Sequence, residues 1–437
     1  MSQPRSVLLT IFPNGKWYLH DQRLISRFGT GKKLKASVGS LSKRKTVILG
    51  LPQIQPGRIR TKVRLKMWNG HLRIGPLMGI LTVGEGSSFY GNRENFRDII
   101  QYGSKLGALV YVFTPNGIDW EEKQVRGFLY DEKQRLWIEA TLPFPQVVYN
   151  RIPSRKWEQK PEVNKTLEQI AKLQHVTLFN LRFFNKLQLF QILVKAPHVA
   201  KFLPETKSLD SYENFEAFCS RHASVYLKPV LGKAGEGIMR LDRFQKRWRL
   251  RQVHQQESVT RYFFNLRTVW RYIKQQIRSK QYLIQEGITL AKYRGRPFDI
   301  RVLVQKNGAG EWGVTGVGIR RAGARSITTH VPRGGSMQST TKVLRTLFGS
   351  EKEQLLRQIH QTALEIANAL NEQIPSLAEM SMDLGLTRDG QLWFFEANAK
   401  PEKFDEPAIR RSSLSNLIHY AQHVSRMAPV ELQEETG

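Results

Sequence analysis

Cysteine is nearly absent from this chain: Cys219 is the single one among 437 residues, so no disulfide can form within the chain. We expect its thiol to be buried and unreactive. The sequence also lacks a cluster of histidine and cysteine with the spacing of a zinc site. No apolar run approaches the roughly 18 residues of a membrane-spanning helix, and Pro13 breaks the apolar N-terminal stretch, which has no small-residue cleavage site. These absences favour a cytoplasmic protein.

Acidic residues are scarce as well, with 37 Asp and Glu against 68 Lys and Arg, which gives a net charge of +31. Residues 1–75 hold 16 basic residues against Asp21 alone, and residues 240–280 hold 12 against Asp242 and Glu257. Such segments attract polyanions, including nucleic acid, acidic polymers and anionic lipid. Neither segment matches a nucleic-acid-binding motif, so a merely solvated basic surface is the alternative.

The second basic segment also predicts a helix. Its apolar residues recur at helical spacing, namely Phe263, Leu266, Trp270, Ile273 and Ile277. This periodicity favours core packing of these side chains over stacking on nucleic-acid bases.

Length and local patterns predict two or three domains. Residues 1–75 contain short β-branched runs between glycine, proline and asparagine, which predict a small basic β-rich module. Residues 76–160 begin with a strand, a glycine turn, an amphipathic helix and a second strand, which is typical of a Rossmann-like domain; they lack a dinucleotide fingerprint. Residues 161–430 form the remaining domain.

The glycine-rich segment GKAGEG, residues 232–237, lies between two predicted strands. Its glycines permit positive φ angles and bring backbone N–H groups close together, which can make a concave anion site. Lys228 on the preceding strand would add a fixed positive charge for a phosphate. No helix follows and the pattern GxxxxGK[ST] is missing, so the segment is not a P-loop. A glycine hairpin that merely turns the chain is the alternative.

Further candidate residues lie on the strands that follow. YLIQEGITL predicts a strand that ends at Gln285 and Glu286, where backbone groups can meet an adenine edge. PFDIRVLVQ places Asp299 and Arg301 two residues apart on one strand face, a spacing that favours an ion pair along the strand over a site. EWGVTGVGIRRAG predicts its hairpin partner and carries Arg320.

Near its C-terminal end, the chain has the run LWFFEANAKP, in which an apolar strand ends on Glu396 and Asn398, two residues apart and on one face. We expect the aromatic residues of this run to pack in the core. Asp389–Gly390 predicts a two-residue hairpin turn before the strand, which would bring Asp383 opposite these two side chains. Two carboxylates and an amide oxygen suit Mg²⁺, because that ion prefers oxygen ligands.

The order of these motifs resembles the ATP-grasp superfamily of carboxylate–amine ligases over roughly residues 180–425. In addition, VVYNRIPSRKWE and FEANAKPEKFDEP are similar to segments of the YheC/YheD group of endospore coat-associated proteins. The resemblance implies an α/β chain of the α+β ATP-grasp type, with a Rossmann-like domain before a two-lobed ATP-grasp domain. Its glycine-loop lobe would span about residues 200–285 and its metal-hairpin lobe about residues 286–425. It also implies a spore-forming Gram-positive source and an association with the spore coat.

The resemblance also implies ligands: ATP and one or two Mg²⁺ ions. The nucleotide set that it gives is Lys186, Lys228, Gly232, Lys233, Gly235, Glu236, Gly237, Gln285, Glu286, Gly287 and Ile288. It gives Asp383, Glu396 and Asn398 as metal ligands, and Arg301 and Arg320 as catalytic contacts to the γ-phosphate or an acyl phosphate. Lys400 and Glu402 depart from the family's serine and glycine, at a place where the substrate could be chosen.

The reaction implied by the resemblance joins an unknown carboxylate to an unknown amine. The carboxylate attacks the γ-phosphorus of ATP, and the amine displaces phosphate from the resulting acyl phosphate. The basic segments suggest an acidic polymer or peptide as substrate. The alternative is a basic structural component of the spore coat that has lost catalysis and binds polyanions. Contact with nucleic acid through residues 1–75 and 240–280 is compatible with either.

Overall fold

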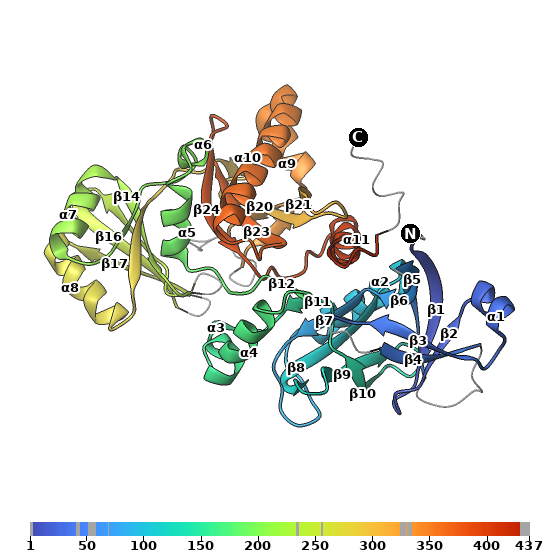
Figure 1. The fold of residues 1–437 in the computed structure, drawn as a ribbon. Coiled ribbons are helices and arrows are strands. Elements are labelled where there is room, and N and C mark those ends of the chain that lie inside the picture. The colour runs from blue at the N-terminus through green and yellow to red at the C-terminus, as the bar shows by residue number, and fades with distance from the viewer. Residues whose placement is uncertain are drawn as a thin grey trace.

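The computed structural model describes residues 3–40, 44–50, 58–68, 70–232, 236–254, 257–323, 329 and 334–428. Four β-sheets follow one another along the chain, and the first two lie at one end of an elongated molecule while the last two lie at the other (Figure 1). Among the helices of this described part, none combines the length and the apolar character needed to cross a membrane.

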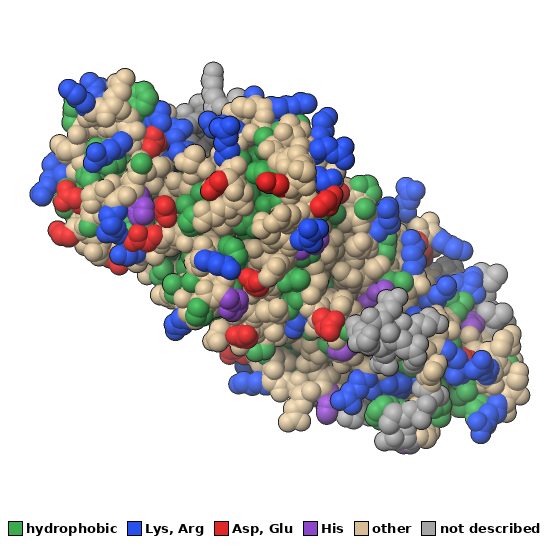
Figure 2. Space-filling view, turned by 90° about the horizontal axis from the view of Figure 1, so that it is seen from above, with side chains coloured by type: hydrophobic (Ala, Val, Ile, Leu, Met, Phe, Trp, Pro, Cys, Tyr) green, Lys and Arg blue, Asp and Glu red, His purple; other side chains and the backbone are tan. Residues whose placement is uncertain are grey.

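The first sheet is a closed barrel with the strand order β1-β2-β4-β3-β6-β5. Its elements are β1 (Arg5–Ile11), β2 (Trp17–His20), α1 (Gln22–Phe28), β3 (Lys33–Val38), β4 (Arg44–Leu49), β5 (Ile59–Trp68) and β6 (His71–Gly75). The strands alternate with period two: β5 buries Ile59, Thr61 and Val63 and exposes Arg60 and Lys62. Lys and Arg side chains therefore cover much of this end of the molecule, at the right of Figure 2.

The second sheet has the order β10-β9-β8-β7-β11-β12. Its elements are β7 (Leu77–Leu81), α2 (Arg93–Leu106), β8 (Leu109–Asp119), β9 (Gln124–Asp131), β10 (Leu136–Pro143), β11 (Val147–Asn150), α3 (Arg155–Glu158), α4 (Pro161–Ala171) and β12 (Thr177–Phe179). β7, β8, β11 and β12 are parallel, as the predicted strand–helix–strand opening requires. Residues 161–179 belong to this sheet and its core, past the boundary that the sequence suggested at residue 160.

The third sheet has the order β13-β18-β14-β15-β16-β17. Its elements are β13 (Thr206–Ser208), α7 (Tyr212–Arg221), β14 (Ser224–Pro229), β15 (Met239–Phe244), β16 (Arg247–His254), β17 (Glu257–Phe263), α8 (Leu266–Ile277) and β18 (Tyr282–Glu286). α7 and α8 cover one face, where Ile273 and Ile277 pack with Leu241 and Leu250. The predicted core packing of the apolar residues of α8 is confirmed. Cys219 of α7 is buried, and burial raises the pKa of its thiol to about 12, as expected for an unreactive cysteine.

The fourth sheet runs β22-β21-β20-β23-β24, and β19 (Lys292–Tyr293) also pairs with β20. Its strands are β20 (Arg296–Lys306), β21 (Trp312–Arg321), β22 (Ser336–Gln338), β23 (Glu379–Leu386) and β24 (Leu392–Asn398). The helices that share its core are α5 (Lys186–Leu193), α6 (Pro197–Ala200), α9 (Thr340–Phe348) and α10 (Lys352–Gln373), with the short η2 (Gly349–Glu351) between the last two.

The last helix, α11 (Pro407–Val424), lies between the two halves of the molecule (Figure 1). Leu417 and Ile418 of α11 pack with Phe96 and Ile99 of α2, in a core that also holds residues of β7, β8 and β11. The C-terminal helix therefore completes the core of the second sheet.

Candidate functional site

The β23–β24 hairpin brings the three predicted metal ligands together. Asp383 on β23 pairs in register with Glu396 on β24, and Asn398 lies two residues further along β24, opposite Ser381. The predicted two-residue turn is wrong: Thr387 and Gln391 hydrogen-bond each other and enclose residues 388–390. Gly390 has a φ of 83°, but Asp389 is not left-handed, and a two-residue type I′ turn would require a positive φ at both positions.

A β-bulge lies at the site itself. The register shifts between Asp383 and Leu384, so that Leu384 faces Phe394 and Phe395 is the extra residue. Phe394 is fully buried in the core, as predicted. Phe395 is only half-buried, and the Lys228 Nζ lies 5.6 Å from the centre of its ring. The bulge therefore turns one aromatic ring of the run toward the third sheet, where the sequence predicted core packing for all of them.

The predicted catalytic arginines both lie beside Asp383. Arg320 Nη2 is 2.7 Å from Asp383 Oδ2, and Arg301 Nη1 is 3.9 Å from Asp383 Oδ1. The ion pair predicted between Asp299 and Arg301 is wrong: Arg320, directly opposite on β21, donates to Asp299 through Nε and Nη2 at 3.0 and 2.6 Å. Arg301 instead donates to Ser381 Oγ at 3.0 Å.

The two arginines differ in exposure. The Arg320 side chain is 3% exposed and Arg301 is 20% exposed. The two carboxylates beside Arg320 raise its pKa, although burial alone would lower it. Arg320 therefore holds Asp299 and Asp383 in place, while Arg301 is the arginine that a ligand can reach.

The predicted phosphate lysines reach the hairpin from two other elements. Lys186, the first residue of α5, pairs with Glu396 Oε2, and Lys228 on β14 donates to Gln285 Oε1 on β18. Burial, with a contribution from the charge of Lys186, lowers the pKa of Lys228 to about 8. α5 thus contributes one cation around Asp383, Glu396 and Asp299, and the third and fourth sheets contribute three.

The glycine segment and the predicted adenine strand flank these cations. Gly237 has a φ of 72°, and its carbonyl accepts a hydrogen bond from Tyr282 Oη at 3.0 Å, so the end of the loop is fixed to β18. Gly232 and Glu236 are also described, whereas Lys233 and Gly235 lie outside the described residues.

On the adenine side, the backbone N–H groups of Glu286 and Gly287 already donate to Glu205 O and Ser224 O. The next residue of the predicted adenine set is Ile288, and its backbone N–H has no acceptor in the described part of the chain. The Glu286 carboxylate accepts from Glu205 N at 3.3 Å, on the opposite strand face from Gln285. An adenine edge would therefore be recognised by the Ile288 N–H and by carbonyl groups rather than by the Glu286 side chain.

The oxygen donors of the hairpin fit a magnesium ion. Asp383 Oδ1 is buried and has no hydrogen-bond donor among the described residues. Glu396 faces it across the hairpin and Asn398 adds an amide oxygen. A hard oxygen set of this kind suits Mg²⁺ and not zinc. No group of three or more His, Cys, Asp or Glu able to hold a metal occurs within the described ranges.

Lys400, the departure from the family pattern, has a structural role. Its side chain is 3% exposed and pairs with Glu158 of α3, whose side chain is 5% exposed. Glu158 also accepts from Asn150 Nδ2 and from the Phe183 N–H, both at 3.2 Å. Burial lowers the pKa of Lys400 to about 7. The expectation that Lys400 could choose a substrate is therefore wrong, because its ammonium group faces inward; Glu402, by contrast, is exposed.

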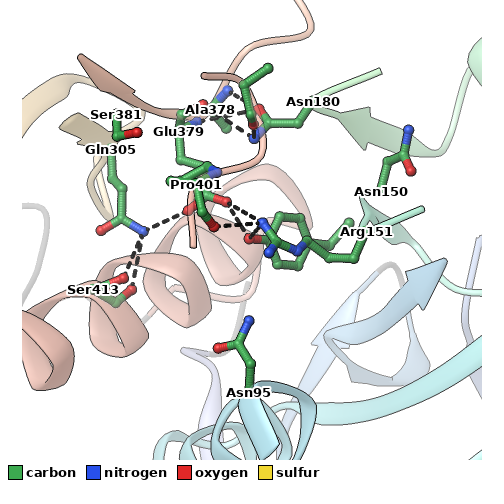
Figure 3. A network of polar contacts seen from close by, with 12 residues as sticks. Asn95, Asn150, Arg151, Asn180, Gln305, Ala378, Glu379, Ser381, Pro401 and Ser413 are labelled. Atoms are coloured by element: carbon green, nitrogen blue, oxygen red, sulfur yellow. Dashed lines mark hydrogen bonds and ion pairs between the residues drawn. The ribbon is translucent and has the colours of Figure 1, made fainter. Parts of the chain in front are cut away.

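A second group of buried residues, which the sequence analysis missed, fixes the open end of the hairpin (Figure 3). Asn180 accepts from the Ala378 N–H at 3.1 Å and donates to Glu379 O and Ala399 O, so one side chain joins both hairpin ends. Arg151 donates to Pro401 O at 3.1 Å. The signal for Arg151 and Glu158 was present in the segment VVYNRIPSRKWE, which was noted only for its resemblance.

The same region encloses a small polar cavity. Tyr149 donates to Glu379 Oε1, and Gln305 Nε2 donates to Glu379 Oε2 at 3.0 Å. The cavity beside them, lined also by Pro401 and Arg410, has a volume of about 20 Å³. That is room for about one water molecule, so this cavity is too small for a peptide or an amino acid.

Comparison with known proteins supports the resemblance seen in the motifs. A family model described as YheC/D like ATP-grasp matches residues 175–424, which include every proposed ligand of the site. The chain is 30% identical over 383 residues to the endospore coat-associated protein YheD of Bacillus subtilis (strain 168), covering 84% of this chain and 83% of that protein. It is 23% identical over 304 residues to YheC of the same strain, covering 70% and 84%.

Solved structures are more distant. The VanG D-Ala:D-Ser ligase from Enterococcus faecalis has 11% sequence identity and a TM-score of 0.48, over 80% of this chain and 99% of that one. The family match and the relative at 30% identity decide the assignment: this chain belongs to the YheC/D-like ATP-grasp family. The predicted fold class, an α+β ATP-grasp chain, is thereby confirmed.

Proposed function

We propose that this chain is an ATP- and Mg²⁺-dependent carboxylate–amine ligase that works through an acyl phosphate and is associated with the bacterial spore. The observation that carries the proposal is the arrangement around Asp383. Two carboxylates and an amide on one hairpin meet Lys186, Lys228 and two arginines that come from α5 and from two sheets. Its family membership supports the same reaction class.

The charge around the site supports a polyphosphate ligand. Lys186, Lys228, Arg301 and Arg320 give four positive charges, against the three carboxylates of Asp299, Asp383 and Glu396. Mg²⁺ bound by Asp383, Glu396 and Asn398 would neutralise phosphate charge and orient the phosphate oxygens. The two lysines would offset the remaining phosphate charge, and a phosphate would compete with Glu396 for Lys186. Charge neutralisation and positioning account for most of the catalysis in phosphoryl transfer.

The two arginines have different proposed roles. Arg301 can contact the transferred phosphoryl group or the acyl phosphate, because it is the more exposed of the two. Arg320 is a positioning residue, since it is buried and already pairs with Asp299 and Asp383. The substrates that we propose are a carboxylate and an amine, one of which is an acidic polymer or peptide.

A second candidate is a basic structural component of the spore coat that binds polyanions without catalysis. The net charge of +31 and the printed names of the two relatives favour it. The metal-ligating oxygens at Asp383 oppose this second candidate. Asp383 Oδ1 is buried and accepts no hydrogen bond among the described residues, which is costly in a protein that binds no cation there.

The test is Mg²⁺-dependent ADP release by the full-length chain in spore extract, followed by mass spectrometry of the product. Asp383→Asn should lower the rate by about 100-fold or more. Asp389→Asn makes the same charge change in the exposed turn of the same hairpin and should leave the rate unchanged. Equal rates in both variants would refute the assignment of Asp383. A chain that binds no ATP in a direct binding assay would refute the ligase proposal altogether.

A further inference from the structure

The face of the third sheet that points away from α7 and α8 extends beyond the residues of the proposed reaction. Met239, Leu241 and Leu250 point toward α7 and α8, so their neighbours on β15 and β16 point to the opposite face. The register places these neighbours in three rows across β15, β16 and β17. The rows are Arg240–Arg251–Thr260, Asp242–Arg249–Tyr262 and Phe244–Arg247, and Phe264 follows directly after β17. We call this surface the arginine–aromatic face.

The charge of this face is strongly positive. It holds four arginines and one carboxylate, Asp242. Arg249 donates to Asp242 Oδ2, and Arg251 Nη2 lies 3.0 Å from Asp242 Oδ1. Arg240 Nε is 3.8 Å from the same oxygen. One buried carboxylate therefore fixes the guanidinium groups of Arg249 and Arg251, while Arg240 beside them donates to Ser224 Oγ at 3.0 Å, and the cluster keeps a net positive charge.

Aromatic rings lie among these arginines. Tyr262 is 49% exposed and Phe264 is 76% exposed, which is unusual for rings of this size. Arg249 lies 4.6 Å from the centre of the Phe244 ring, and Arg247 lies 4.7 Å from that of Phe264. The face thus alternates guanidinium planes and rings over the edge of a sheet.

We propose that the arginine–aromatic face binds single-stranded nucleic acid. Proteins that bind single strands combine a positive surface for the phosphates with exposed aromatic rings on which bases stack. An acidic peptide would use the arginines but would leave Phe264 without a partner. Duplex DNA would offer no open base to these rings, and a flat sheet face does not enter its grooves as a helix does. The exposed aromatic rings therefore favour a ligand with unpaired bases over an acidic peptide or duplex DNA.

This proposal does not depend on the ligase reaction. The face begins at the side of the sheet that carries the candidate site: Tyr226, two residues before Lys228, is opposite Arg240, and the Arg240 guanidinium lies 5.5 Å from its ring centre. β17 is about 15 Å from β14, since three strand spacings separate them. A nucleic-acid strand bound at β16 and β17 would thus lie next to the proposed ATP-binding region without occupying it.

The experiment measures fluorescence anisotropy of a labelled oligothymidylate of about 12 nucleotides with the full-length chain. Phe264→Ala should weaken binding by about five- to a hundredfold, because one base loses its stacking partner without a change of charge. The matched control is Trp120→Ala, which removes an exposed ring outside both basic segments, residues 1–75 and 240–280. It should leave the affinity unchanged.

A second pair of variants separates this face from the general positive charge of the chain. Arg247→Gln should lower the slope of log affinity against log salt by about 0.7, the value for one phosphate contact on a single strand. Arg271→Gln on α8 removes an equal charge from the opposite side of the same sheet and should not change the slope. Neither arginine forms an ion pair among the described residues, so both variants should fold, and their melting temperatures are compared with that of the unmodified chain.

Three results would overturn the proposal. The first is equal weakening by Phe264→Ala and Trp120→Ala, or by Arg247→Gln and Arg271→Gln, which would show that only total charge or nonspecific contact matters. The second is binding of polyglutamate of the same charge with equal affinity and equal sensitivity to Phe264→Ala, which would assign the face to an acidic peptide. The third is equal affinity for a duplex of the same length.

Discussion

The buried pair of Lys400 and Glu158 gives the sharpest test of how the hairpin is held in place. The two residues are 242 positions apart, and both side chains are almost fully buried. Lys400→Met keeps much of the side-chain volume but removes the ammonium group. Glu158 then retains only two neutral donors, Asn150 Nδ2 and the Phe183 N–H. Breaking a buried ion pair by removing one partner costs about 3–5 kcal/mol, because the remaining charge is left uncompensated.

A double-mutant cycle tests whether the lost stability comes from the interaction between Lys400 and Glu158. Lys400→Met combined with Glu158→Gln removes the stranded charge but keeps a side-chain oxygen for the two neutral donors. We expect the double variant to regain most of the lost stability, to within about 1–2 kcal/mol of the unmodified chain. The coupling energy of the cycle is the sum of the two single losses minus the loss in the double variant, so it should be at least about 1 kcal/mol in favour of the pair.

The assay is urea unfolding at about pH 6, below the pKa of about 7 that burial gives Lys400, so that its ammonium group is charged. Unfolding is followed by tryptophan fluorescence, in which Trp157, the residue before Glu158, reports locally. Hydrogen exchange of β23 and β24 gives a second readout, which should rise in Lys400→Met because Lys400 directly follows Ala399, an anchor of the hairpin. Two results would refute the reasoning: a loss of less than about 0.5 kcal/mol in Lys400→Met, or additive effects of the two substitutions within about 0.5 kcal/mol.

Three further predictions concern the nucleotide side of the site. The pKa of Lys228 is about 8, so its ammonium group loses its proton as pH rises above that value, and ATP affinity should fall there by up to about tenfold per pH unit. Lys228→Arg stays charged and should abolish this fall. If the pH profile of Lys228→Arg equals that of the unmodified chain, Lys228 does not contact a phosphate. The same lowered pKa means that the unfolded chain binds one more proton than the folded chain between pH 8 and about 10.4. Lys228 therefore makes folding more favourable as pH rises through that window. Lys228→Met should remove this gain from the pH dependence of urea unfolding. Gly237→Ala should slow ADP release several-fold at little cost in global stability, since a φ of 72° is strained for alanine and the carbonyl of Gly237 fixes the loop to Tyr282; a rate equal to that of the unmodified chain would show that the loop end has no catalytic role.

The sequence predicted the parts of the site that depend on local pattern. Alternation along β24 placed Glu396 and Asn398 on one face, and the glycine signal predicted a hairpin that brings Asp383 opposite them. The turn length was wrong, because a dipeptide signal alone does not determine which residues adopt a positive φ. The bulge that turns Phe395 toward Lys228 leaves no mark in the alternation of apolar residues.

The contacts that join distant segments could not be predicted in the same way. Asp299 was assigned to Arg301 on its own strand, but the residue directly across the ladder, Arg320, is closer and better placed for a bidentate contact. Asn180 was not singled out in the sequence, and Lys400 was singled out only as a departure from the family pattern. Their roles depend on partners far away along the chain, and no local period encodes such a pairing.

The position of α11 has a consequence for how the protein is made. The apolar side of α2, with Phe96 and Ile99, leaves the ribosome more than 300 residues before Leu417 and Ile418, which cover it. At a synthesis rate of about 5–20 residues per second, the part of this core that α11 covers stays open for tens of seconds, although β7, β8 and β11 already pack on the rest of it. A nascent chain at this stage exposes an apolar surface that chaperones recognise, so production in a host short of chaperones should yield aggregates whose contacts involve α2.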